Sequence, residues 1–200
     1  MPEIKFSTEE YNLVRNHQIF DIKATIINKI HVLFSQIEEN INQSISVSTF
    51  QFPDHVLLGQ GKISKGENYQ NCPYVVLDYP RLFSKKDIFT FRTIFWWGHY
   101  FSNSFIIAGK SYQQYVKYFI EKSEYLNNSN WYICTYKTPW RLENEENNYI
   151  QLSKLSIDKL LNYLDNKHFI KIARIYPIDD YQLLKSQTNT FFMNILDILK

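Results

Sequence analysis

PYVVLDY, at residues 73–79, is the stretch of sequence that decides the fold. A short run of β-branched and aromatic residues is typical of a strand, and Pro80 is expected to end it. The stretch lies within residues 59–109, which contain all five glycines of the chain. Because glycine provides the backbone freedom that turns and bulges need, the middle of the chain is predicted to form strands with tight connections, and the two flanks to be mostly helical.

Both flanks carry the spacing of amphipathic helices. Ser7 and Glu10 have the spacing of a capping box, in which each side chain binds the other residue's backbone amide, so a helix is expected to begin there. A longer helix is predicted over residues 18–43 and a last one over residues 179–199, because apolar residues recur in both every three or four positions. The stripe of the longer helix consists of Ile19, Ile22, Ile26, Ile30, Leu33, Ile37 and Ile41.

Short elements are predicted between the flanks. Runs rich in β-branched and aromatic residues predict strands over residues 45–52, 92–98, 101–108, 131–136 and 168–176. Each of three serines is expected to cap a short helix, namely Ser84, Ser111 and Ser156. Residues 139–148 are predicted to form a solvated polar loop, which carries Glu143, Glu145 and Glu146.

Residues 84–97 allow two interpretations. Apolar residues on every side of this segment leave its period undecided, and in one interpretation a helix continues through Trp97 and ends at Gly98. We favour strands, with Gly98 at a bulge or bend. The connections are then too short for helical crossovers. The chain is therefore predicted to be a single α+β domain over residues 1–200, with a central, largely antiparallel sheet flanked by N-terminal and C-terminal amphipathic helices.

Composition excludes several classes of protein. The chain is 44% hydrophobic and 21% charged, which indicates a globular rather than a disordered protein. It contains no run of eighteen apolar residues and no secretory signal, so no membrane contact is expected. Cys72 and Cys134 are expected to be reduced, in a cytoplasmic protein. The net charge of +2, with a pI of about 8.3, makes nucleic-acid binding the least favoured function.

No complete phosphate-binding or metal-binding motif is found in the sequence. Residues 61–66 match the first part of a phosphate-binding loop, but Glu67 and Asn68 follow where that loop needs Lys and then Ser or Thr. The five histidines are scattered, and the two cysteines lack the spacing of metal ligands. The sequence therefore predicts no metal and no cofactor.

The candidate site lies in residues 62–102, where charged and aromatic side chains concentrate. The candidate ligand-binding residues are Lys65, Glu67, Asp78, Arg81, Arg92, Trp96 and His99. Alternate residues of a strand share a face. If residues 73–79 and 92–98 pair in antiparallel fashion, Asp78 is expected to meet Arg92 and to form a bidentate ion pair.

Two interpretations of this segment remain open. In the first, the residues converge in a central aromatic and cationic cleft for a small anionic ligand. Lys65 and Arg81 then supply positive charge, and Trp96 or Trp97 supplies a flat apolar wall. Either Glu67 or Asp78 supplies an acid–base or hydrogen-bonding carboxylate. In the second, the ion pair is structural and the tryptophans lie in the core.

The run KGENYQNCPYVVLDYPRLFSKKDIFTFRTIFWWGHYFS, residues 65–102, resembles a stretch of a family of uncharacterised small bacterial proteins. The resemblance covers about a fifth of the chain. It implies no activity and no catalytic residue, because the family has no assigned activity.

Two functions from different classes follow. The first is a non-catalytic binding or interaction module, because aromatic residues make up 17% of the chain and their apolar bodies with polar tips suit interfaces. The amphipathic terminal helices would then pack against a second copy in a homodimer. The alternative is an enzyme for small molecules, in which a carboxylate and arginine cluster performs acid–base or anion chemistry.

Overall fold

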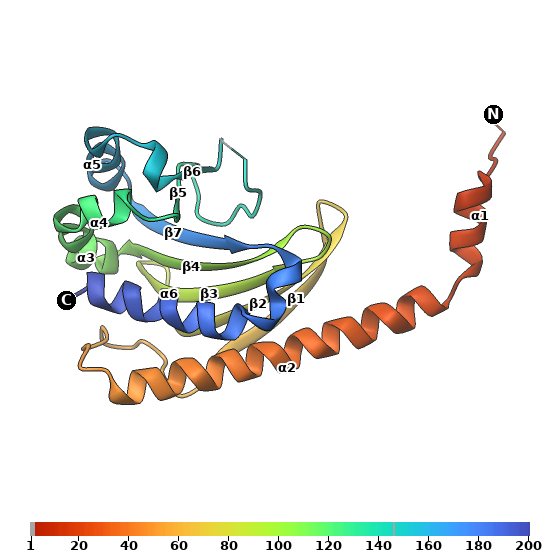
Figure 1. Ribbon diagram of the computed structural model, residues 1–200, viewed down its shortest axis with the longest axis horizontal. Helices are drawn as coiled ribbons and strands as arrows, with labels where there is room; N and C mark the ends of the chain where they lie inside the picture. The colour runs from red at the N-terminus through yellow and green to blue at the C-terminus, as the bar shows by residue number, and fades with distance from the viewer. Residues whose placement is uncertain (1–2, 146) are drawn as a thin grey trace.

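The computed structural model describes residues 3–145 and 147–200 (Figure 1). Within these ranges the α-helices are α1 (Thr8–Arg15), α2 (Gln18–Val47), α3 (Lys110–Glu121), α4 (Ser123–Asn127), α5 (Ile157–Asp165) and α6 (Leu184–Ile198), and two short 3-10 helices are η1 (Leu152–Lys154) and η2 (Ile178–Gln182). The strands are β1 (Lys62–Tyr69), β2 (Cys72–Phe83), β3 (Asp87–Trp96), β4 (Tyr100–Gly109), β5 (Tyr132–Cys134), β6 (Tyr149–Gln151) and β7 (Phe169–Tyr176). The predicted α+β class is confirmed.

All seven strands belong to one sheet, in the order β1-β2-β3-β4-β7-β5-β6, and each pair of neighbours is antiparallel. The first four strands follow one another through short turns. Gly98 lies in the turn from β3 to β4 with a φ of 74°, a left-handed conformation that glycine adopts without strain. The bend predicted at Gly98 is therefore confirmed.

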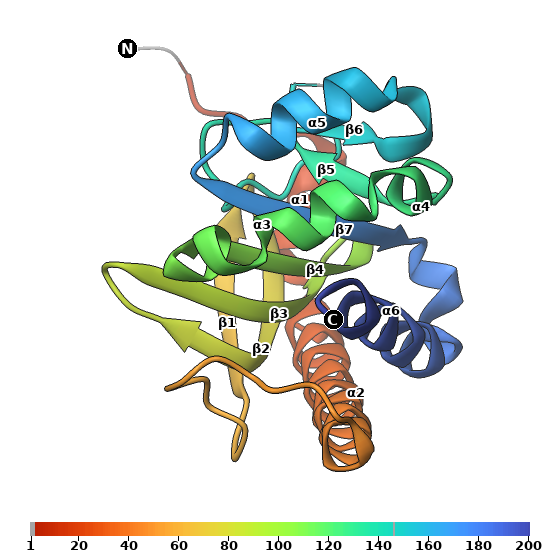
Figure 2. The ribbon, with the colours of Figure 1, turned by 90° about the vertical axis from the view of Figure 1, so that its left-hand side faces the viewer.

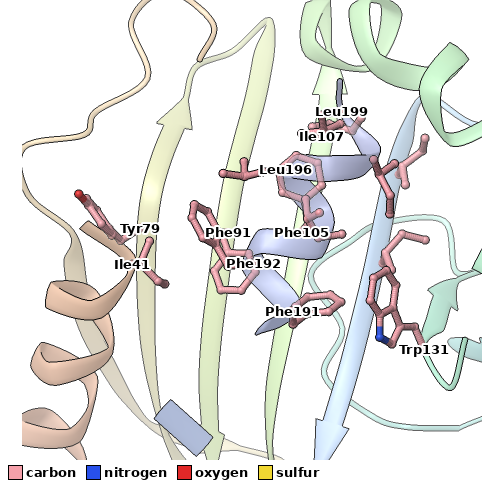
Figure 3. Packing of buried hydrophobic residues seen from close by; sticks show 14 of the residues in the cluster. Ile41, Tyr79, Phe91, Phe105, Ile107, Trp131, Phe191, Phe192, Leu196 and Leu199 are labelled. Atoms are coloured by element: carbon pink, nitrogen blue, oxygen red, sulfur yellow. The ribbon is translucent and has the colours of Figure 1, made fainter. Parts of the chain in front are cut away.

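The main core lies between one face of the sheet and helices α2, α3 and α6 (Figures 2 and 3). Alternate strand residues point into it. Phe91 meets Phe192 of α6 edge to face, with ring centroids 5.2 Å apart, and Phe105 stacks on Phe119 of α3 at 6.3 Å. The stripe of α6 fits this core because its aromatic and branched residues recur at helical spacing.

The other face of the sheet carries a smaller apolar cluster of Val76, Ile94, Trp96 and Leu142. Leu142 belongs to the segment between β5 and β6, so a loop and not a helix covers this face. Helices therefore cover one face of the sheet, and a loop covers the apolar cluster on the other face.

Residues 84–97 form a turn and a strand, as favoured, and the predicted helix after Ser84 is wrong. The amide of Ser84 donates to the carbonyl of Asp87 at 2.9 Å, which closes a tight turn into β3. The expected end of β2 at Pro80 is also wrong, since β2 continues to Phe83. The register of β2 on β3 shifts between Asp78 and Arg81, and this irregularity accommodates a residue without an amide hydrogen.

Two further boundaries correct the sequence prediction. Residues 45–47 continue α2 and do not start a strand, because Ile45 extends the helical stripe one turn beyond Ile41 and packs against the core. Ser111 does not cap α3. Gly109 precedes that helix, and the Ser111 amide donates to Asp87 Oδ1 at 2.8 Å.

The predicted caps at Ser7 and Ser156 are confirmed. Ser7 and Glu10 form a complete capping box at α1, and Ser156 accepts from the amide of Lys159 at α5. The last helix is shorter than predicted, because residues 178–182 form a 3-10 turn before α6.

Candidate functional site

The predicted contact between Asp78 and Arg92 is confirmed. The two residues are register partners in β2 and β3, and Arg92 donates from Nε to Asp78 Oδ1 at 2.6 Å and from Nη2 to Oδ2 at 2.9 Å. Asp78 is only 4% exposed. The guanidinium also lies over the rings of Phe83 and Trp140, 5.8 and 5.0 Å from their centroids, which orients it further.

Arg81 lies on the same face of the sheet as this ion pair. Its register partner is Thr90, whose hydroxyl donates to Asp78 Oδ1 at 3.4 Å. Arg81 Nε is buried and has no hydrogen-bond partner. The structure therefore brings Asp78, Arg81 and Arg92 together.

Lys65 and Glu67 do not join this group, which corrects the predicted convergence. Lys65 pairs with Val75, a residue of the main core, so its side chain belongs to the opposite face. Glu67 forms an ion pair with Lys23 of α2 at 2.5 Å. The hydrogen bond from Lys23 lowers the pKa of the Glu67 carboxyl. Lys23 of α2 thus holds Glu67 away from Asp78, whereas Lys65 is separated from Asp78 by its place on the opposite face of the sheet.

Trp96 and His99 lie on the face of Asp78 but do not form an open wall. The two rings stack with centroids 3.6 Å apart, and Trp96 is 2% exposed. Tyr69 and Tyr100 meet the indole edge to face at 5.4 and 5.6 Å. Trp96 is a core residue, as the second interpretation of the sequence predicts.

These contacts limit the chemistry of the cluster. Both carboxylate oxygens of Asp78 accept hydrogen bonds from Arg92, and Oδ1 also accepts one from Thr90, so the side chain is held in a bidentate ion pair. The ion pair joins two strands and holds the guanidinium between two aromatic rings. Its geometry is that of a structural pair.

The loop before β6 is not the solvated excursion that the sequence predicts. Glu143 is 7% exposed and accepts hydrogen bonds from Tyr69 Oη at 2.7 Å, from Gln70 Nε2 at 2.5 Å and from Arg141. Burial raises the pKa of Glu143, but the hydrogen bonds from Arg141 and Tyr69 outweigh it, and the net pKa is lowered. Glu145 remains exposed, and Glu146 lies outside the described residues.

Lys171 is a buried amine on the same face of the sheet. Its side chain comes from β7, and Nζ donates to the carbonyls of Pro139 at 2.8 Å and Arg141 at 3.1 Å. Burial lowers the pKa of Lys171 to about 7. The amine lies 5.0 Å from the ring centroid of Tyr149, and the nearby Cys134 thiol has a raised pKa because it is buried. Sequence reasoning missed Lys171, although a lysine between Ile170 and Ile172 was a usable signal.

The largest unexplained feature is the N-terminal arm, defined here as residues 3–25. It contains α1 and the first two turns of α2, which continue past the sheet into solvent (Figure 1). Lys23 is the one arm residue that is not exposed. The exposed apolar side chains of the arm are Ile4, Phe6, Tyr11, Leu13, Val14, Ile19, Phe20 and Ile22, and Phe20 is 69% exposed.

Two open apolar cavities lie beside the arm and share Trp97 as a wall. The larger, of about 660 Å³, lies between α2, the turn from β3 to β4, and η2, and its apolar lining includes Ile26, Leu33 and Phe101. The smaller, of about 520 Å³, lies between the arm and the end of the sheet. These cavities and the arm form one apolar surface.

Similarity to known proteins, metal ligands and membrane-spanning helices are further indicators of function. Comparison with family models, with curated proteins and with solved structures found no match. The resemblance of residues 65–102 therefore stays a prediction. Among the described residues, no three His, Cys, Asp or Glu side chains are grouped to hold a metal ion. In the same part of the chain, no helix combines the length and apolar character that crossing a membrane requires.

Proposed function

We propose that this protein is a non-catalytic interaction module that binds a protein partner through its N-terminal arm and the apolar cavities beside it. The observation that carries the proposal is the exposure of eight apolar side chains on the arm. Four of them, Leu13, Val14, Ile19 and Phe20, line one cavity, and contiguous exposed apolar surface is typical of interaction sites.

The charge of the arm favours a protein as the partner. Its acidic residues, Glu3, Glu9, Glu10 and Asp21, outnumber its basic residues, Lys5, Arg15 and Lys23. Anionic lipid surfaces and nucleic-acid backbones require a basic excess. An apolar helical face with balanced charge is suited to a groove on another protein.

The enzyme alternative receives less support. It requires the carboxylates and cations to converge on one site, whereas Asp78 is paired with Arg92 and Glu67 is held by Lys23 of α2. The proposal also places the protein in the cytoplasm. Both cysteines are free thiols, which is the usual state in a reducing compartment.

Site-specific photo-crosslinking in the full chain tests the proposal. The photoreactive residue benzoylphenylalanine replaces Val14 or Phe20, one at a time, and living cells that express the chain are irradiated. We expect covalent adducts of defined mass from both positions, because both side chains line the smaller apolar cavity.

The matched control places the same photoreactive group at Tyr125, which is 47% exposed. Tyr125 belongs to α4, and this helix lies at the end of the molecule opposite α1 (Figure 1). No adduct of the same mass is expected there. A second variant, Leu13→Glu with the photoreactive group at position 20, is expected to lose the adduct. Equal adducts from Tyr125, or none from the arm, would contradict the proposal.

A further inference from the structure

The larger cavity beside α2 has a rigid apolar floor. The ring centroids of Phe95 and Phe101 lie 5.1 Å apart, and Trp97 meets Phe95 edge to face at 6.1 Å. Phe95 and Phe101 are 4% and 1% exposed, and Ile30 and Leu33 of α2 supply the opposite wall. Because the core already holds these side chains, a ligand does not have to order them, which lowers the cost of binding.

Charge distinguishes this cavity from the smaller one. Each is lined by apolar side chains and by one charged residue, Lys29 in the larger cavity and Lys23 in the smaller. Lys23 has a carboxylate partner, since its Nζ lies 2.5 Å from Glu67 Oε2. Lys29 has no ion-pair partner among the described residues. Asp179 and Asp180 of η2 do not line the cavity. The larger cavity therefore combines an apolar hollow with one unpaired cation.

We propose that the larger cavity binds a single-chain carboxylate, such as the anion of a free fatty acid. The carboxylate lies at Lys29, and the alkyl chain lies against Leu33, Trp97 and Phe101. Such a ligand supplies the anion that Lys29 lacks and covers the apolar floor. The inference goes beyond the proposed function and does not depend on it, because no residue of the arm lines this cavity.

The dimensions favour a chain of medium length. A volume of about 660 Å³ is within the usual range of small-molecule sites. Residues 26–36 of α2 line the cavity, and ten steps along the helix axis cover about 15 Å. An extended chain of roughly twelve carbons has nearly this length, because its single bonds of about 1.5 Å alternate in direction.

The chain and the headgroup contribute differently to binding. Each methylene group that leaves water strengthens binding, so a chain shorter by two methylenes is expected to have a dissociation constant roughly tenfold higher. Lys29 is exposed, and water screens its charge. The lysine therefore selects the headgroup, and the chain supplies most of the affinity.

Isothermal titration calorimetry of the full chain with dodecanoate, below its micellar concentration, tests the binding. We expect a one-to-one complex, and decanoate to bind roughly tenfold more weakly. Val32→Asp is expected to raise the dissociation constant at least tenfold, because it adds a carboxylate to the cavity lining. The native Val32 is 59% exposed, so the variant is expected to fold. The matched control is Val47→Asp on the same helix, where the native side chain is 80% exposed and outside the cavity, and it is expected to bind as the wild type does. Melting curves check that both variants fold.

Charge reversal tests the place of the headgroup. Lys29→Glu is expected to raise the dissociation constant of dodecanoate roughly tenfold and to lower that of dodecyltrimethylammonium, whose headgroup is a cation. Lys117→Glu on α3 is the control, because Lys117 is exposed and does not line the cavity, and it is expected to change neither constant.

Three results would overturn the inference. The first is a wild type that binds no dodecanoate, and the second is a Val32→Asp variant that binds it as the wild type does. The third is a loss of binding in Phe20→Asp but not in Val32→Asp, which would assign the ligand to the smaller cavity.

The outcomes also separate this inference from the proposed function. Binding of dodecanoate without adducts from the photoreactive arm would support the inference and contradict the interaction module. Adducts from the arm without binding of dodecanoate would support the module and contradict the inference.

Discussion

The C-terminal helix and the N-terminal arm carry the same kind of sequence pattern and have opposite surroundings. Helix α6 buries seven residues against the sheet, whereas α1 buries none. Both are amphipathic, with apolar residues three and four positions apart. The difference teaches that periodicity predicts a helix and a contact face but does not say which molecule supplies the contact. In α6 the sheet supplies it, and for the arm we propose a protein partner.

The largest expected effect is on the free energy of unfolding. We compare the loss of one phenylalanine ring from each region. Phe191→Ala in α6 is expected to lower the free energy of unfolding by about 3–5 kcal/mol, because the ring is fully buried against Phe91 and Trp131 and its loss leaves a cavity. Phe20→Ala in the arm is expected to change it by less than about 0.5 kcal/mol in the monomer. Urea unfolding measures both.

A similar loss in the two variants would break the comparison. It would mean that the arm folds back onto the body in solution, and that its exposed side chains are not available to a partner.

Much of the fold follows from local patterns that the structure preserves. The register of Asp78 with Arg92 was predictable because strand residues alternate between faces and the connection between β2 and β3 is too short for a helical crossover. The caps at Ser7 and Ser156 were predictable because capping depends on neighbours three residues apart. These features need no information from distant segments.

The candidate site was less predictable because it depends on contacts between distant segments. Glu67 is held by Lys23, which lies 44 residues earlier, and no pattern near Glu67 indicates that partner. Glu143 looked solvated among charged neighbours, yet Tyr69 and Gln70 of the β1–β2 hairpin bury it. The exposure of the arm was unpredictable for the same reason. Ile19 and Ile22 belong to the same apolar stripe as Ile30 and Ile37, yet only the later two are buried.

The next effect is a change of stability with pH, caused by the buried amine of Lys171. The arm contains no comparable buried group. The pKa of Lys171 is about 7 in the folded protein, against 10.5 for an ordinary lysine. Above pH 7 the unfolded chain therefore holds a proton that the folded chain has lost, and stability rises with pH by up to about 1.4 kcal/mol per pH unit. Urea unfolding between pH 7 and pH 9 is expected to show this rise, and Lys171→Met to remove it.

The upper limit of pH 9 follows from the neighbours of Lys171. Burial raises the pKa of Cys134 and of Tyr149, so their ionisation in the unfolded chain lowers stability at higher pH. The exposed Lys185 of α6 serves as the control, and Lys185→Met is expected to keep the rise. An equal slope in wild type and Lys171→Met would show that the amine stays charged inside the protein.

The smallest expected effect concerns the ion pair between Lys23 and Glu67, which ties the arm to the edge of the sheet. Both side chains are partly exposed, at 32% and 56%, so water and salt screen the pair. Glu67→Gln is expected to leave global stability unchanged and to make amide hydrogen exchange in residues 18–25 modestly faster, at low salt only. The control is Glu39→Gln on the exposed side of α2. Exchange that does not respond to Glu67→Gln at low salt would show that the pair does not restrain the arm, and that its direction depends on the backbone of α2 alone.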